Sequence, residues 1–354
     1  GELMAGGTVN HLSGSRDLAV SFRLAPVDLS ALGMEIAALD RAEGRVQASL
    51  ELRGTTSDPK LRGQLSLQDG ALRIKGFPLP LDDIDLDVRI VPGEIRVRRA
   101  VARTGSSGHL ALSGRLPFDG LELTGATATL VARNVKVPIA DGVRLTADAM
   151  LNASYAPGPA GAPKRLPNIT GTVSLTSFSY TRPMSFSLDL DRLTGGGATD
   201  VETYNPDDDW VTFDINLVSP TPLKISNNLL DMKLEVTPPG LRMMGTNQRF
   251  GSRGSLRLVP GSKLFLQGHD FSVRDGTVVF DDSTRIAPRL DVHAHTDYRR
   301  YSQSAQVDPS AATDSGSGAS SGGQWRIEMH AFGDTDAPQV RFSSDPPLSQ
   351  EDIV

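Results

Sequence analysis

Residues 83–90 read Asp-Ile-Asp-Leu-Asp-Val-Arg-Ile. Every second position in this stretch carries a branched aliphatic side chain, and every position between carries a charge. Successive side chains of a β-strand point to opposite faces of the sheet, so the alternation places the four aliphatic side chains on one face. We therefore predict a strand with one apolar face and one face in water.

The same period of two recurs along the chain at intervals of about 10 to 15 residues. Asp, Arg, Ser, Thr and Asn occupy many of the alternate positions. The apolar residues are expected to form one continuous face, which would either line an open groove or fill a closed core. The residues predicted for this face are Leu65, Leu67, Leu72, Ile74, Ile84, Leu86, Val88, Ile90, Ile95, Val97, Leu110, Leu112, Val173, Leu175, Phe186, Leu188, Leu190, Phe213, Ile215, Leu217, Leu234, Val236, Leu256, Leu258, Leu264, Leu266, Phe271, Val273, Val278, Phe280, Leu290, Val292, Ile327, Met329, Val340 and Phe342.

One segment has the periodicity of a helix instead. Between Asp28 and Leu39 the apolar residues recur at helical spacing, with Asp28 or Ser30 as the N-cap, which predicts one short helix near residues 28–40. Parallel strands need long crossovers that are usually helical, so the scarcity of helical patterns favours an all-β, antiparallel sheet.

The composition excludes several classes of function. Of the 354 residues, 38% are hydrophobic and 5% aromatic, which is lean for a thick globular core and favours a thin, extended shape. The net charge of −6 and the lack of a basic run argue against a nucleic-acid partner. The absence of cysteine excludes disulfides and thiolate chemistry.

Three segments interrupt the strand pattern: 157–167 is rich in proline, 195–209 ends in three aspartates, and 302–323 is rich in Ser, Gly and Ala. We expect loops or linkers here, with 302–323 flexible. The predicted division is a β-repeat segment over 1–156, a linker over 157–167 and a second β-domain over 168–354. A start without Met, and an ending at 349–354 that reads as the first turn of a helix, predict a piece of a longer protein.

Two stretches resemble each other, namely residues 64–74 and residues 270–280. Each places two apolar residues before an Asp-Gly pair and at least one after it. We interpret this as a repeated unit of strand, Asp-Gly turn and strand, typical of a β-solenoid-like or open-trough array. Composition alone leaves a closed sandwich and an open trough equally acceptable.

Several stretches resemble one family of bacterial envelope proteins. Residues 61–72, 77–84 and 108–114 resemble the repeat of the TamB and AsmA-like family, and residues 271–280, 287–292 and 342–353 resemble the TamB C-terminal domain. The resemblance implies an open β-taco fold, a U-shaped trough, in the periplasm of a diderm bacterium. It also implies an inner-membrane anchor outside this chain and an outer-membrane partner barrel of the Omp85 type, such as TamA or BamA.

The same resemblance implies no catalytic residues and no cofactor. It implies that the trough carries glycerophospholipid between the inner and outer membranes, with acyl chains against the apolar residues named above. The alternative is a scaffold that assists the assembly of outer-membrane β-barrels. A third hypothesis, an adhesin-like β-repeat, predicts a surface-export signal in the complete gene.

Two polar clusters are candidate metal sites. Asp291, His293 and His295 share one face of a predicted strand, but a polar strand face is the more economical interpretation. Residues 207–209 are three consecutive aspartates without the spacing of a calcium loop, so a solvated loop is expected. The chain contains no nucleophile elbow, zinc-protease motif or phosphate-binding loop, which argues against an enzyme.

Overall fold

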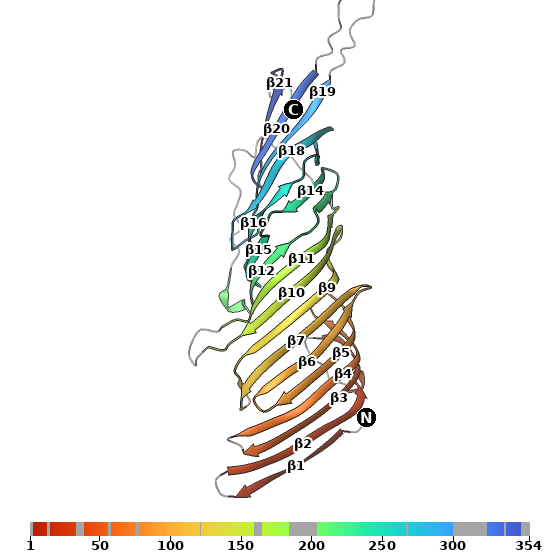
Figure 1. Ribbon diagram of the computed structural model, residues 1–354, viewed down its shortest axis with the longest axis vertical. Coiled ribbons are helices and arrows are strands. Elements are labelled where there is room, and N and C mark those ends of the chain that lie inside the picture. The colour runs from red at the N-terminus through yellow and green to blue at the C-terminus, as the bar shows by residue number, and fades with distance from the viewer. Residues whose placement is uncertain are drawn as a thin grey trace, which may run out of the picture.

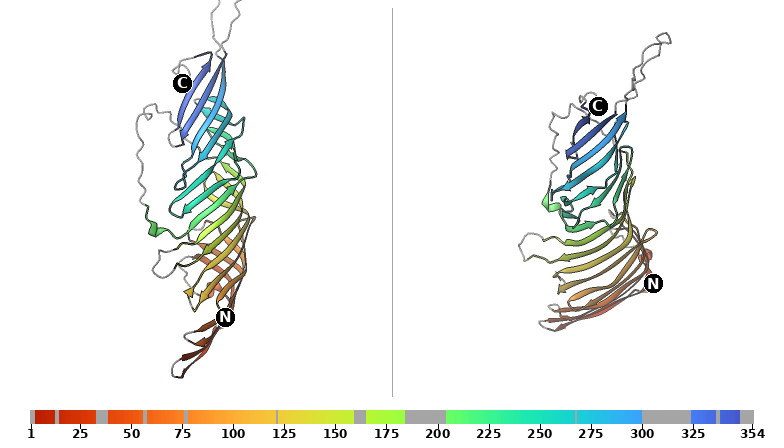
Figure 2. Two further views of the ribbon diagram at one scale, coloured as in Figure 1. Left: turned by 60° about the vertical axis from the view of Figure 1, so that its left-hand side comes forward. Right: turned by 45° about the horizontal axis from the view of Figure 1, so that its top comes forward.

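The computed structural model describes residues 3–12, 15–32, 39–55, 58–75, 78–120, 122–158, 165–183, 204–266, 268–299, 324–335 and 338–347. Strands dominate these residues and form one sheet of 21 strands. The strands stack along the long axis of the molecule, from β1 at one end to β21 at the other (Figure 1). The sheet twists and curves as it rises and remains open (Figure 2). The predicted extended, curved all-β fold is therefore confirmed.

The first half of the chain forms long strands. These are β1 (Leu3–Leu12), β2 (Ser15–Asp28), β3 (Leu39–Thr55), β4 (Pro59–Ile74), β5 (Leu81–Val91), β6 (Glu94–Thr104), β7 (Gly108–Asp119), the short β8 (Glu122–Leu123), β9 (Ala126–Ala140), β10 (Val143–Tyr155) and β11 (Asn168–Tyr180).

The second half contains several shorter strands, and the described residues also include two 3₁₀ helices. The strands are β12 (Thr212–Val218), β13 (Leu223–Ser226), β14 (Leu230–Val236), β15 (Leu241–Thr246), β16 (Phe250–Leu258), β17 (Lys263–Leu266), β18 (His269–Phe280), β19 (Arg289–Arg299), β20 (Gln324–Asp334) and β21 (Gln339–Asp345); the helices are η1 (Leu29–Leu32) and η3 (Pro206–Asp208).

The pairing is a meander over most of its length. Strands β1 to β7 each pair antiparallel with the next, and β9, β10 and β11 continue the order. The antiparallel prediction is wrong at one step, because β11 pairs in parallel with both β12 and β13. Parallel pairing needs a long connection, and residues 181–211 provide one between β11 and β12.

The rest of the sheet is again antiparallel. Strand β12 pairs with β15, β15 with β16 and β16 with β18. Strands β18, β19, β20 and β21 then pair in order. Beside this path, β14 pairs with β13, β16 and β17. The C-terminal half of the sheet is therefore more branched than the N-terminal half.

The Asp-Gly pairs are not hairpin turns, which corrects the repeat predicted above. Asp69-Gly70 lies inside β4 and Asp275-Gly276 inside β18, and the pairing register shifts at both places. Such a β-bulge inserts one extra residue into a strand. The insertion moves the apolar positions from odd to even numbers, so Leu65 and Leu72 stay on the same face. The two bulged strands are the true repeated feature.

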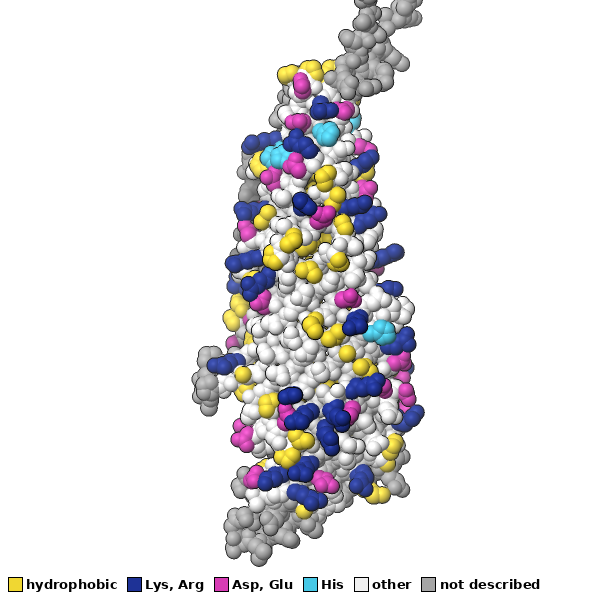
Figure 3. All heavy atoms as spheres, viewed as in Figure 1, with side chains coloured by type: hydrophobic (Ala, Val, Ile, Leu, Met, Phe, Trp, Pro, Cys, Tyr) yellow, Lys and Arg dark blue, Asp and Glu magenta, His cyan; other side chains and the backbone are white. Residues whose placement is uncertain are grey.

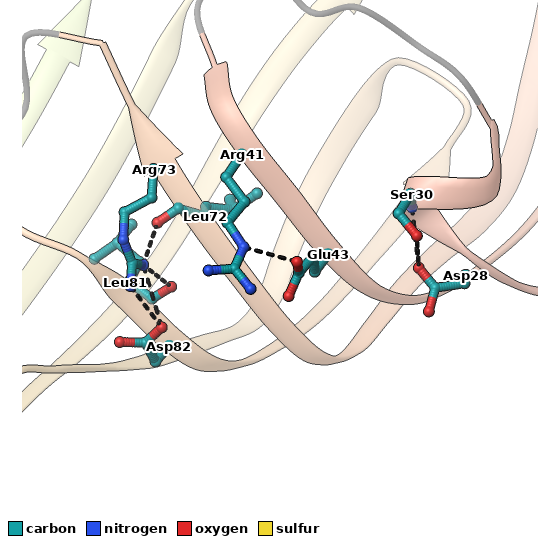
Figure 4. A network of polar contacts seen from close by, with 8 residues as sticks. All are labelled: Asp28, Ser30, Arg41, Glu43, Leu72, Arg73, Leu81 and Asp82. Carbon is teal, nitrogen blue, oxygen red and sulfur yellow. Dashed lines mark hydrogen bonds and ion pairs between the residues drawn. The ribbon is translucent and has the colours of Figure 1, made fainter.

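The predicted helix is shorter than expected. Helix η1 covers only Leu29–Leu32, and Leu39 already begins β3, where it pairs with Ile74. The backbone amide and the hydroxyl of Ser30 both donate to Asp28 Oδ1, at 3.0 and 2.7 Å (Figure 4). Long-range strand pairing therefore overrides the local helical spacing at the far end of the segment. Residues 33–38 lie outside the described part of the chain.

The proline-rich segment connects two strands of the same sheet. Strands β10 and β11 pair from Val143↔Tyr180 to Ser154↔Asn168, so the sheet continues across residues 157–167. The predicted flexible loop at 302–323 and the predicted helical turn at 349–354 lie outside the described residues.

Candidate functional site

The inward face of the sheet carries continuous rows of apolar residues. Residues directly opposite each other on paired strands share a face, so the register traces each row across the sheet. The first row, one residue per strand, is Val27, Val46, Leu67, Leu86, Ala100, Leu112, Leu130, Leu151, Gly171, Ile215 and Met243. The second is Leu24, Ala48, Leu65, Val88, Val97, Gly114, Ala128, Ala153, Ile169, Phe213 and Gly245.

Small residues stand at intervals in these rows. Ala100 follows Leu86 in the first row, and Gly114 and Ala128 follow Val97 in the second. A third row contains Ala102, Leu110, Ala132, Ala149, Val173, Leu217 and Leu241. No charged side chain enters any of the three rows. The face is therefore apolar over more than half of the sheet.

Two packed clusters lie on this face. The N-terminal cluster is centred on Leu24, Val46, Ala48, Leu67 and Ile84. The larger C-terminal cluster is centred on side chains such as Leu258, Val273 and Met329, each only 2% exposed. In the C-terminal half the apolar face is consequently filled by its own side chains.

The predicted inward residues divide among these regions. The N-terminal cluster includes Leu65, Leu67, Leu72, Ile84 and Leu86. The C-terminal cluster includes Val173, Leu175, Leu217, Leu234, Val236, Leu256, Leu258, Leu264, Leu266, Phe271, Val273, Val278, Phe280, Leu290, Val292, Ile327, Met329, Val340 and Phe342. The predicted residues Phe186, Leu188 and Leu190 lie outside the described part of the chain.

The remaining nine predicted residues belong to neither cluster and stay partly accessible. We call this set the central lining: Ile74, Val88, Ile90, Ile95, Val97, Leu110, Leu112, Phe213 and Ile215. Leu112, in the middle of the first row, is 40% exposed. An apolar side chain exposed to that degree on an otherwise apolar face offers a surface to another apolar molecule.

The opposite, outward face is polar and carries several ion pairs. Asp83, Asp85 and Asp87 of β5 face arginines of β6, at 3.3 Å to Arg103, 3.6 Å to Arg99 and 3.9 Å to Arg98. Charged side chains of both signs are spread over the face seen in Figure 3, with small groups of hydrophobic side chains between them. Exposed ion pairs contribute little to stability, but here they indicate that the outward face is in contact with solvent.

A second pair on the outward face is bidentate. The guanidinium of Arg242 on β15 donates to both carboxylate oxygens of Asp214 on β12, at 2.6 and 2.7 Å. These hydrogen bonds lower the pKa of Asp214 below its usual value. Asp214 therefore stays ionised and outward beside Ile215, its inward neighbour in the first row.

A network of polar contacts connects β4 and β5 at one edge of the inward face, which we call the polar rim. Arg73 donates to the carbonyl oxygens of Leu72 and Leu81 and forms an ion pair with Asp82 at 3.1 Å (Figure 4). Nearby, Arg41 donates to Glu43 at 2.7 Å, which raises the pKa of the arginine. The polar side chains satisfy the backbone at the rim while Leu72 packs against the N-terminal cluster.

The aspartates of 207–209 do not act as one group. Asp209 is buried and accepts a hydrogen bond from the hydroxyl of Tyr204 at 2.7 Å. Asp207 and Asp208 are exposed in helix η3. The three consecutive aspartates therefore have different surroundings.

The histidines of β19 lie on the outward face, as their spacing indicates. The structure brings His330 of β20, instead of His295, beside Asp291 and His293. Sequence reasoning missed His330 because it is separated from β19 by residues 300–323, and only the strand register reveals the proximity.

None of the helices in the described part of the chain has the length and hydrophobicity needed to span a bilayer.

Comparison with known proteins agrees with the geometry. A family model for the TamB C-terminal domain matches residues 98–354, which is most of the chain. The chain belongs to the TamB family. No curated protein and no solved structure matches it.

Membership of the TamB family indicates the functional class and the cellular location of its proteins. The TamB family is a non-enzymatic family of transport and assembly components, and its members work with an outer-membrane partner in the periplasmic envelope. The TamB match begins at Arg98, inside β6, and runs across the proline-rich segment to the end of the chain. It includes four of the nine residues of the central lining and the whole C-terminal cluster.

Proposed function

We propose that the chain is part of a periplasmic conduit that moves glycerophospholipid between the inner and outer membranes of a diderm bacterium. The acyl chains would lie against the central lining, with headgroups at the polar rim. The observation that carries this proposal is the first row, which runs from Val27 to Met243 without a charged residue.

The energetic requirement is large. Transfer of one acyl chain of roughly 16 carbons from a membrane into water costs about 0.8 kcal/mol per methylene, or about 13 kcal/mol. A conduit must offset most of this cost at every step, so gaps in the apolar surface would act as barriers. The central lining and the apolar residues between its members provide a surface without such gaps.

The dimensions also support transport along the sheet. Adjacent strands lie about 4.8 Å apart, so the first row spans about 50 Å. The residues of the central lining are partly exposed, whereas the residues at the centre of the N-terminal and C-terminal clusters are buried. We infer that lipid travels along the part of the trough between β5 and β12.

The cellular setting follows from the family. We propose that the complete protein is anchored in the inner membrane, and that its partner is an outer-membrane barrel of the Omp85 type such as TamA or BamA. We propose no catalytic role and no cofactor for the conduit.

A second function, a scaffold for outer-membrane barrel assembly, is favoured by the sheet edges. Among the described strands, β1 pairs only with β2 and β21 only with β20. An edge strand with unpaired backbone groups can accept a further strand by β-augmentation. The densely packed C-terminal cluster would give β21 a rigid support for that role.

Charge substitution separates the two functions. In the native bacterium, the gene would carry Leu112→Asp, which places a carboxylate in the first row, or Ala111→Asp, on the exposed outward side of the same strand. We expect Leu112→Asp to slow the arrival of pulse-labelled phospholipid in the outer membrane and Ala111→Asp to leave it unchanged. Barrel assembly would be followed in the same cells.

Each outcome has one meaning. Slow lipid arrival with normal barrel assembly supports the conduit. Normal lipid arrival with defective barrel assembly in the Leu112→Asp strain would support the scaffold instead. Normal lipid arrival in both strains contradicts the conduit.

A further inference from the structure

A histidine pair lies on the outward face, opposite the C-terminal cluster. His293 of β19 stands directly across from His330 of β20, and Asp275 of β18 stands across from His293 on the other side. Their neighbours Val292 and Met329 point to the packed inward face and are 8% and 2% exposed. The alternation of the strands therefore presents Asp275, His293 and His330 side by side to the solvent.

The two imidazole rings are stacked. Their centroids are 4.3 Å apart and their planes differ by 9°. One carboxylate reaches both rings, because Asp291 Oδ1 lies 2.7 Å from His330 Nε2 and 4.0 Å from His293 Nδ1. One ligand atom from each of Asp291, His293 and His330 lies within 4.8 Å of the other two.

We propose that Asp291, His293 and His330 bind a divalent transition-metal ion of the Zn²⁺ class. Two imidazole nitrogens and a carboxylate oxygen form a common donor set for zinc, with the remaining position open to water or a further ligand. Ligand atoms around one tetrahedral zinc ion lie about 3.3 Å apart, given metal-ligand distances of about 2.0 to 2.1 Å. The separations in the cluster bracket that value.

Both rings must turn out of their parallel stack to bind one ion, because the nitrogen lone pairs lie in the ring planes. The histidine side chains are 36% and 37% exposed and that of Asp291 is 60% exposed, so an ion can reach them and they have room to turn. The backbone need not move, because the paired strands already fix the three Cα positions. Beside the rings lies a hollow of about 340 Å³, lined in part by Arg274, His295 and Glu328.

Asp275 adds a second carboxylate. Its Oδ1 lies 3.0 Å from His293 Nδ1, and its Oδ2 accepts a hydrogen bond from Arg274 at 3.0 Å. A bound ion would take this nitrogen, so Asp275 would not orient the ring through a hydrogen bond to it. Its carboxylate would place a further negative charge beside the ion, and we expect this charge to strengthen binding.

The site would join strands that are distant in sequence. Residues 300–323 separate β19 from β20, and closing so long a connection costs chain entropy. An ion held by both strands binds only when they are paired, so metal binding is coupled to their association. The stabilisation should appear in thermal unfolding as well as in binding.

The test uses the tag-free chain of residues 1–354 after removal of metal with EDTA. Zn²⁺ is titrated in calorimetry, with Mg²⁺ and Ca²⁺ as hard-cation controls. We expect one tightly bound Zn²⁺ per chain, no comparable heat from Mg²⁺ or Ca²⁺, and a rise in the unfolding temperature on zinc addition. Circular dichroism confirms that each variant is folded.

Four histidine variants and one aspartate variant decide the assignment. His293→Asn and His330→Asn should each abolish the tight site and the thermal shift, while His295→Asn and His109→Asn should retain both. Asp275→Asn should weaken binding, because it removes a negative charge beside the ion. Zinc binding that is absent from the wild-type chain, or that persists unchanged in the His293→Asn and His330→Asn variants, overturns the proposal.

Discussion

Gly44 of β3 and Gly70 of β4 approach so closely that a Cβ atom on Gly44 would lie 2.6 Å from the Cα of Gly70. Gly70 is the second residue of the Asp-Gly bulge, and it stands opposite Ile84 of β5. Gly44 has a φ of +120°, a conformation that other residues rarely adopt. Two glycines thus allow the bulge to form against the N-terminal cluster.

Gly44→Ala should lower the free energy of unfolding by about 2 to 3 kcal/mol, because the new methyl group meets backbone at a strained φ. Urea unfolding measures the change. The matched control is Gly105→Ala, at a φ of +57° with no atom within 4 Å of the added Cβ. This variant should lose only about 1 kcal/mol, and equal losses at the two sites would contradict the close-approach explanation.

The two regions of the inward face should respond differently to truncation. Met329→Ala removes a side chain that is 2% exposed and should cost about 2 to 5 kcal/mol of unfolding free energy. Leu112→Ala removes one that is 40% exposed and should cost about 1 kcal/mol or less. Chemical unfolding of both variants measures the contrast. A loss at Leu112 as large as that at Met329 would mean that the central lining is a closed core.

Asp282 gives the loop after β18 a dependence on pH. The hydroxyl and amide of Thr284 donate to its carboxylate, and these hydrogen bonds, with Arg285, lower its pKa from 3.8 to about 2. The unfolded chain has the higher pKa, so the stabilisation is complete above about pH 4 and is lost as the pH falls toward about 2. Carbon-detected NMR titration of Asp282 measures the pKa directly.

Comparison with Asp282→Asn provides a second measurement. The difference in unfolding free energy between the wild-type chain and this variant should be constant near neutral pH and shrink in the acid range. A difference that does not change with pH would contradict the assignment, as would an unshifted NMR pKa.

The alternation of residues 83–90 was sufficient to predict β5 and its faces, because a period of two admits no other regular structure. The same reasoning placed Leu112 and Ile215 on strands. It failed at Asp69-Gly70, because an Asp-Gly pair is typical of a hairpin turn, whereas the phase of the flanking apolar residues indicates a bulge. When the apolar residues change from odd to even positions and too few residues lie between them for a loop, the pattern indicates a β-bulge.

Other features depend on contacts that sequence cannot supply. The parallel pairing of β11 with β12 is a long-range contact across residues 181–211, and no local pattern in the sequence specifies it. The proximity of His330 to His293 depends on the register of β19 and β20. The burial of Met329 and the exposure of Leu112 depend on the packing of the C-terminal cluster, since both residues occupy similar alternating patterns.

Site-specific photocrosslinking in cells tests the central claim most directly. A photoreactive phenylalanine analogue would replace Leu112 or Ile215 on the inward face, or their outward neighbours Ala111 and Asp214. Adducts would be identified by mass spectrometry. The conduit predicts phospholipid attached at Leu112 and Ile215 and none at Ala111 and Asp214. Phospholipid at neither pair, with the inward probes crosslinked only to the chain itself, would contradict an open groove.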